Sequence, residues 1–229
     1  MRMKPHPEDP GYRVWLSDDE VEQLIETMHD RGGTTHRIAG RYGVHCGLRR
    51  DEASQSRPVD VVESHDDTVL RVWEDQAKRD KYRETPIPRD LADQIRMVPE
   101  FTDLDVDDAT LDVTGKTLNR WVKRAGEELA AETGDEGWLR VTYHDLRRTW
   151  GTRMLEAGVL PSVVMWHGGW DDWETFRKHY LGEFSPDALA RERNKVEWLG
   201  GDGPATSDDV ESHVTTAAPP TGTASYQTD

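Results

Sequence analysis

His144 and Arg147 lie three residues apart in a segment whose other residues predict a helix. Thr142 is a suitable N-cap and Asp145 occupies the third helical position, which is the pattern of a capping box. Residues three apart on a helix project from one face, so these two cations are placed to hold one phosphate group. Tyr180 follows further along the chain and is a candidate to attack such a phosphate. Neither a glycine-rich nucleotide loop nor a metal-ligand cluster accompanies them, which favours metal-free chemistry at a DNA phosphate.

The rest of the chain predicts an α+β fold, mainly α with a small antiparallel β-sheet. Ser17 and Glu20 form another capping box, with Leu16 and Val21 as a hydrophobic staple. We expect three helices that begin near residues 17, 48 and 185. We expect further helices over residues 34–45, 90–98, 114–133, 142–158, 161–166 and 171–180. Extended segments at 58–62, 68–73 and 83–88 predict the sheet; the prolines of the third place it at an edge, and 74–82 is a hairpin tip.

The expected organisation is a flexible leader over 1–10, one domain over 11–199, and a disordered acidic tail over 200–229. No apolar run approaches the length of a membrane helix, and the N-terminus lacks the apolar core of a signal peptide. Cys46 is the single cysteine, which excludes an internal disulfide and indicates a residue packed in the core. The sequence therefore predicts a cytoplasmic protein without a membrane partner.

The charge of the chain is unusual for a protein that binds DNA. The formal net charge is −16, and even without the five acids of 200–229 the chain has 40 acidic against 29 basic residues. Only 7 of those 29 are lysine. Abundant acids with scarce lysine resemble the salt-adapted proteins of halophilic archaea, and in molar salt a basic surface gains little from counterion release. The alternative is an acidic protein that never meets DNA.

Four motifs, in order, resemble the catalytic domain of the tyrosine recombinases, the phage integrase family, over about residues 11–199. They are Cys46-Gly47-Leu48-Arg49-Arg50-Asp51-Glu52, the segment from Ala77 to Pro88, Val141-Thr142-Tyr143-His144-Asp145-Leu146-Arg147-Arg148-Thr149, and Gly169-Trp170 followed by Tyr180. The resemblance implies that Tyr180 attacks the scissile phosphate and forms a 3′-phosphotyrosyl link. It implies that Arg49 and Arg147 hold the non-bridging oxygens, whose charge grows in the transition state.

The resemblance assigns the remaining roles as well, without any cofactor or metal. Lys78 would be the general acid for the leaving 5′-oxygen, because a desolvated and cation-rich site lowers the pKa of a lysine. His144 would assist proton transfer at the tyrosine, and Trp170 would donate its indole N–H to a phosphate oxygen. Glu52 would support the site by pairing with nearby basic groups.

Several residues have alternatives. Lys81 lies in the same charged segment as Lys78, which could simply be solvated, and His167 could replace Trp170 as a donor. The interval from Trp170 to Tyr180 is also one residue longer than is usual in the family. Tyr143 is a poor candidate for the nucleophile, and a zinc site at His144, His167 and His179 matches no common ligand spacing. We expect Arg148 and Arg153 to face solvent or DNA phosphates.

The resemblance implies double-stranded DNA as substrate, with a homo-oligomer, a tetramer on DNA, and accessory or directionality factors as further partners. Family members commonly have an N-terminal domain that closes a clamp on DNA, and we expect weaker binding without it. Residues 185–199 would dock on a neighbouring subunit or fold back on their own domain. Two other functions remain open: a type IB topoisomerase-like nicking-closing enzyme, and a degenerate DNA-binding remnant without turnover.

Overall fold

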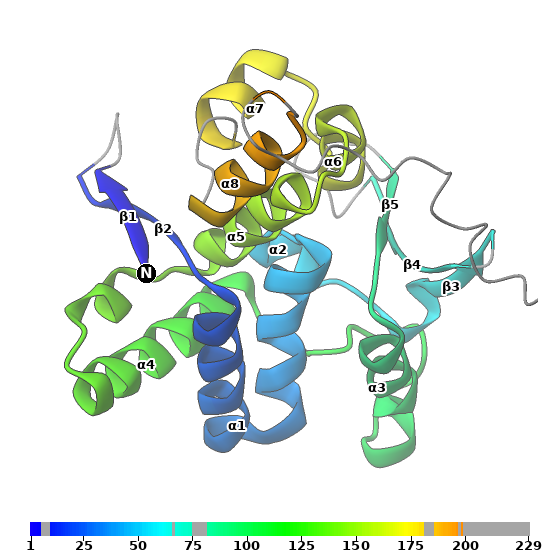
Figure 1. Ribbon diagram of the computed structural model, residues 1–229. Helices are drawn as coiled ribbons and strands as arrows, with labels where there is room; N and C mark the ends of the chain where they lie inside the picture. Colours follow the sequence, from blue (N-terminus) through cyan, green and yellow to red (C-terminus); the bar gives the residue numbers. More distant parts are fainter. Residues whose placement is uncertain (6–9, 66, 75–81, 181–185, 197, 199–229) are drawn as a thin grey trace, which may run out of the picture. The chain divides into compact units, whose positions relative to one another are not determined.

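The computed structural model describes residues 1–5, 10–65, 67–74, 82–180, 186–196 and 198 (Figure 1). The chain divides into two compact units, Met1–Phe184 and Ser185–Asp229. The described part of the second unit contains α8 (Pro186–Asn194), while the tail that we expected to be disordered lies outside the described residues.

The first residues of the chain form a strand where we expected a flexible leader. β1 (Arg2–Pro5) pairs antiparallel with β2 (Tyr12–Trp15), and the amino group of Met1 lies 2.5 Å from the carboxylate of Glu20. β2 buries Val14 and Trp15 against the domain, so it offers a fixed edge to which β1 can bind. Part of the leader is therefore attached by contacts with residues outside it.

Two helical segments joined by a kink make up α1 (Asp18–Cys46). Ser17 and Glu20 form the predicted capping box at its start, and the non-helical Gly32 and Gly33 separate the segments. A Cβ on Gly40 would lie 2.5 Å from the side chain of Ile25, so the two segments pack closely. The kinked α1 in turn packs against α4 (Gly115–Thr133) and α5 (Tyr143–Glu156), as Figure 1 shows. The predictions of two helices near 17 and 34, and of a helix over 114–133, are confirmed.

The three-stranded antiparallel sheet has the order β3-β4-β5, with β3 (Val61–Ser64), β4 (Asp67–Val72) and β5 (Arg83–Pro86). The proline-containing third strand lies at an edge, as predicted. However, the first predicted strand, 58–62, begins as a 3-10 helix, η1 (Pro58–Asp60). Asp60 causes this, because its buried carboxylate accepts hydrogen bonds from Arg57 and from the indole of Trp73, which tightens the turn.

The remaining elements are α2 (Arg50–Ala53), α3 (Arg89–Phe101), η2 (Glu136–Arg140), α6 (Pro161–Gly168) and α7 (Trp173–Tyr180). The main core joins α1, α3, α4, α5 and the sheet. A smaller core of Trp150, Leu155, Val164 and Phe176 joins α5, α6 and α7. Burial of such a side chain stabilises the folded state by about 1.5–3 kcal/mol. This second core therefore holds α6 and α7 beside α5. No helix of the described residues is long and apolar enough to cross a membrane.

Candidate functional site

The turn between α1 and α2 places Arg49 at the start of α2. Gly47 ends α1 with a φ of 64°, and a Cβ there would lie 2.3 Å from the ring of Trp150, so the turn requires glycine. Arg49 then adopts an extended conformation as the N-cap of α2. Glu52 accepts its backbone N–H at 2.7 Å and its Nη1 at 2.6 Å. One carboxylate thus fixes both the backbone and the guanidinium of Arg49.

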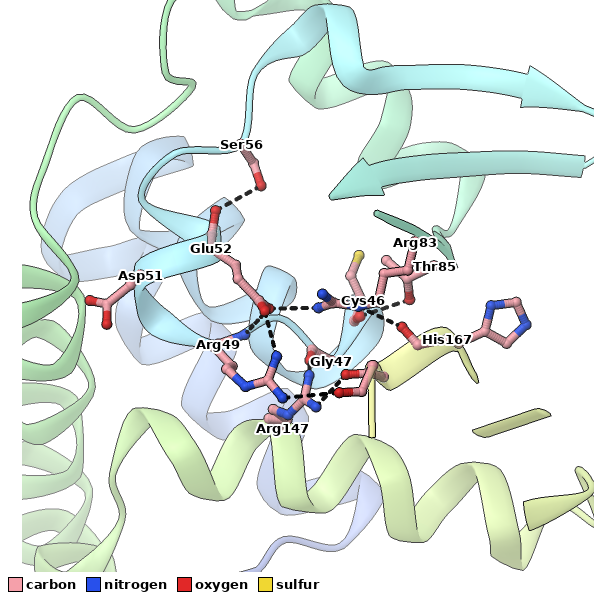
Figure 2. Close-up of polar contacts among 12 residues, drawn as sticks. Cys46, Gly47, Arg49, Asp51, Glu52, Ser56, Arg83, Thr85, Arg147 and His167 are labelled. Atoms are coloured by element: carbon pink, nitrogen blue, oxygen red, sulfur yellow. Dashed lines mark hydrogen bonds and ion pairs between the residues drawn. The ribbon is translucent and has the colours of Figure 1, made fainter. Parts of the chain in front are cut away.

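Arg147 comes to the same place from α5. Its side chain is only 1% exposed, and its guanidinium donates to the carbonyl of Gly47 and, at 2.5 Å, to the carbonyl of Gly168. The guanidinium carbon lies 4.0 Å from the centroid of the Trp170 ring, within the range of a cation–π contact. The fold therefore brings Arg147 and Arg49 together although about a hundred residues separate them (Figure 2).

A third arginine, Arg83 of β5, joins this cluster, although no role was expected for it from the sequence. Its Nη2 donates to Glu52 at 2.6 Å, and its Nε donates to the carbonyl of His167 at 2.9 Å. The alternation of β5 was the available signal: Arg83 and Thr85 are buried, whereas Glu84 is less so. Because that signal does not tell a buried arginine from a solvated one, only the packing revealed it.

Glu52 lies at the centre of the three arginines and is 1% exposed. Burial alone would raise the pKa of this carboxyl, but Arg83, Arg147 and Arg49 outweigh that effect and lower it to about 2. Glu52 is therefore ionised at neutral pH, as the expected supporting role requires. Three guanidinium groups face this single carboxylate, so the cluster retains the excess positive charge needed to bind an anion.

His144 lies in the first turn of α5, at the start predicted for this helix. Thr142 and Asp145 form the capping box, with the backbone N–H of Thr142 donating to Asp145 at 2.9 Å. His144 is exposed, whereas Arg147 is buried, so the two cations expected on one face differ in their access to solvent. A ligand in solvent could therefore contact His144 directly, whereas Arg147 is covered by the surrounding residues.

Trp170 and His167 are the two candidates for the donor to a phosphate oxygen, and the fold gives their rings different neighbours. The ring of Trp170 faces Arg147 and lies near Trp150 and Phe176, with centroids 6.1 and 5.2 Å away. The ring of His167 instead forms a hydrogen bond through Nδ1 with the carbonyl of Glu84 at 2.8 Å. The structure thus places the Trp170 side chain, rather than that of His167, against the arginine cluster.

Tyr180 is the last residue of α7, and its side chain lies outside the described residues. The start of α7 differs from the prediction, because Asp172 rather than Asp171 accepts the N–H of Thr175, at 2.8 Å. Phe176, completely buried, attaches α7 to the small core beside α5. Lys78 and Lys81 also lie outside the described residues.

Two further expectations concern residues around the cluster. Arg148, which we expected at the surface, is buried because it forms an ion pair with the buried Asp145. Arg153 is partly exposed and lies 2.7 Å from Asp18.

Cys46 is buried as expected, and burial raises the pKa of its thiol. Across the described side chains, no three His, Cys, Asp or Glu residues are grouped as metal ligands.

Comparisons with known proteins identify the family and the fold of this chain. The model of the phage integrase family matches residues 14–184. The integrase of Salmonella phage P22 is 32% identical over 59 residues, which is 26% of this chain and 15% of that protein. This chain therefore spans a small part of that relative.

Solved structures with the same fold include the XerA recombinase, with a TM-score of 0.62 and 21% identity over 83% of this chain and 66% of that one. The Tn1549 transposon integrase, in complex with a circular intermediate DNA, matches with a TM-score of 0.62 and 15% identity over 83% and 68%. The catalytic domain of the bacteriophage HP1 integrase matches with a TM-score of 0.54 and 20% identity over 77% and 91%. The fold is thus that of tyrosine recombinase catalytic domains.

Proposed function

Because the chain belongs to the phage integrase family, we propose that it is a site-specific DNA recombinase that cuts and rejoins strands through a 3′-phosphotyrosyl intermediate. The cluster of Arg49 and Arg147 around the buried Glu52 carries this proposal. It is positively charged and lies on elements that also hold α7, the helix that ends at Tyr180. Phosphoryl transfer without a metal requires such an anion site together with a nucleophile, the role proposed for Tyr180.

In the proposed reaction, the phenolic oxygen of Tyr180 attacks the phosphorus and the bond to the 5′-oxygen breaks. The new phosphodiester retains the energy of the old one, so the released 5′-hydroxyl can reverse the step without ATP. Arg49 and Arg147 bind the non-bridging oxygens. Their forked donors interact more strongly with the phosphorane than with the ground-state diester, which lowers the barrier.

The remaining side chains transfer protons, donate a hydrogen bond to the phosphate or orient Arg49. Lys78 gives a proton to the leaving 5′-oxygen, and the exposed His144 takes part in proton transfer at the tyrosine. Trp170 donates its indole N–H to a phosphate oxygen while its ring packs on Arg147. Glu52 orients Arg49 through the two hydrogen bonds that it accepts from it.

We propose double-stranded DNA as the substrate and a homo-oligomer, a tetramer on DNA, as the working assembly, with accessory or directionality factors. The acidic composition, with 45 acidic and 29 basic residues, supports a haloarchaeal protein that acts in a salt-rich cytoplasm. In such salt the Debye length is only about 3 Å, so the acidic surface repels DNA little. Binding then depends on close contacts such as those of the arginine cluster.

A covalent-trapping assay in molar KCl tests the proposal. The protein is incubated with nicked or phosphorothiolate suicide duplexes taken from the flanks of its own genomic element, and the products are separated on denaturing gels. We expect a slowly migrating protein–DNA adduct, and proteolysis with mass spectrometry should locate the attached nucleotide on the peptide that contains Tyr180. DNA binding without any adduct would overturn the proposal and identify a DNA-binding remnant. Relaxation of plasmids that lack the site would instead indicate a nicking-closing enzyme.

Replacement of Arg147 with lysine should lower the rate of strand cleavage at saturating DNA about 10²–10³-fold. Lysine keeps the charge, but its donors all lie on one nitrogen, so it cannot span the carbonyls of Gly47 and Gly168 as the two terminal nitrogens of Arg147 do. The rate is measured in a single turnover on the suicide duplex. Arg148→Lys is the matched control, because Arg148 is the buried neighbour on the same helix and forms its ion pair with Asp145 rather than with the arginine cluster. Equal losses in both variants would contradict a specific role for Arg147.

A further inference from the structure

Three arginines donate to three consecutive backbone carbonyls at the end of α6, which we call the α6 end turn (residues 167–169). Arg83 Nε binds the first carbonyl at 2.9 Å, Arg147 Nη2 the second at 2.5 Å and Arg49 Nη2 the third at 3.3 Å. Figure 2 shows these contacts converging from β5, α5 and the start of α2. Side chains from three separate elements therefore determine where this short turn lies.

The chemistry of a helix end explains why the arginines bind there. The last carbonyls of a helix have no partner within it and carry its negative dipole end, so cations stabilise them. Gly169 ends α6 in the left-handed conformation, with φ at 65°, and the next residue is Trp170, whose ring covers Arg147. A shift of the α6 end turn would consequently move Trp170 as well.

Arg83 differs from the other two arginines in its surroundings. It is 4% exposed, and its Nη2 is engaged by Glu52, itself 1% exposed. A Cβ on Gly169 would lie 3.1 Å from Arg83 Cδ, so the side chain also packs directly on the turn. One guanidinium thus connects the carboxylate that holds Arg49 to the turn that precedes Trp170.

We propose that Arg83 is a positioning residue of the active site: it sets Arg49, through Glu52, and Trp170, through the α6 end turn, in the arrangement that binds the scissile phosphate. This inference rests on the proposed recombinase function. Arg83 has no part in proton transfer or nucleophilic attack. Its effect on cleavage is geometric, because a displacement of about 1 Å in a reacting group can lower a rate about 10²-fold.

Arg83→Lys tests this proposal, since lysine keeps a cation beside Glu52 but has a single point of donation and cannot also hold the carbonyl of His167. We expect single-turnover cleavage at saturating DNA to fall about 10²-fold. Arg57→Lys is the matched control. Arg57 also donates to a buried carboxylate, because its Nε and Nη2 form hydrogen bonds of 3.0 and 2.9 Å with Asp60. These bonds do not involve the α6 end turn.

A second measurement does not depend on cleavage. In protein labelled with 5-fluorotryptophan, the ¹⁹F resonance of Trp170, assigned with Trp170→Phe, should shift in Arg83→Lys and stay in place in Arg57→Lys. A wild-type rate and an unshifted resonance in Arg83→Lys would overturn the positioning role while leaving the recombinase proposal intact. If the unmodified protein forms no adduct, the recombinase proposal fails, and the resonance alone then decides whether Arg83 positions the turn.

Discussion

Replacement of Tyr180 with phenylalanine should abolish the covalent protein–DNA adduct, because the variant lacks the only oxygen with which this side chain could attack phosphorus. Binding of the uncut duplex should persist, since the substitution leaves in place Arg49 and Arg147, the residues proposed to bind the phosphate. The adduct is measured on denaturing gels with a suicide duplex in molar KCl, and binding is measured on the same DNA by fluorescence anisotropy. This is the largest effect that we expect from any single substitution.

Tyr143→Phe is the matched control, because Tyr143 is the tyrosine next to His144 in the sequence. Its side chain is 1% exposed and its hydroxyl donates to the carbonyl of Ala39 at 2.9 Å. Burial raises the pKa of this phenol well above its usual value, so it is a poor nucleophile. The variant should still form the adduct. An adduct that survives Tyr180→Phe and disappears in Tyr143→Phe would show that the nucleophile has been misassigned.

Replacement of Glu52 with glutamine should lower the free energy of unfolding by about 3–5 kcal/mol. The carboxylate pairs with Arg83 and Arg49 at 2.6 Å each, and Arg147 also lies close enough to lower its pKa. Without its charge, three guanidinium groups would repel one another where solvent screens them poorly. Urea unfolding at pH 7, followed by circular dichroism, measures the change. A loss below about 1 kcal/mol, the range of surface ion pairs, would contradict this account of the site.

The stability that Glu52 contributes should depend on pH in a defined direction. The pKa of this carboxyl is about 2 in the folded protein, against 4.5 as its ordinary value, so the folded state favours the ionised form. That contribution is fully present above about pH 4.5 and is lost as the pH falls towards 2. The difference in stability between the unmodified protein and Glu52→Gln should therefore shrink over this range. Glu63→Gln is the control: Glu63 pairs with Arg96 at the surface, so its removal should change stability little.

Much of the local structure was predictable from short stretches of sequence. The capping boxes of Ser17 with Glu20 and of Thr142 with Asp145 form as predicted, and the helix over 115–133 ends at Gly134. Each of these depends on hydrogen bonds between residues three or four apart, so the residues that decide the outcome are adjacent in the sequence. The edge position of β5 was also predictable, from the prolines of the segment 83–88. A proline has no backbone N–H to donate to a further strand.

Several predictions that differ from the structure involve partners far away in the chain. Arg2–Pro5 forms a strand because β2 offers it an edge, and Arg148 is buried because Asp145 and the ring of Trp15 surround it. The helical start at Pro58–Asp60 depends on the indole of Trp73. In each case a distant strand or side chain contributes a contact that local propensity does not report.

The candidate site shows the same division. The sequence by itself determined which residue types are available for phosphoryl transfer, and their resemblance to family motifs singled out Arg49, Glu52 and Arg147. Only the tertiary structure decided that Trp170 rather than His167 lies on Arg147, and that Arg83 joins Glu52 to the α6 end turn. The physical reason is that a buried charge is stable only where opposite charges and hydrogen-bond acceptors converge on it from several elements, and that convergence exists only once the chain has folded.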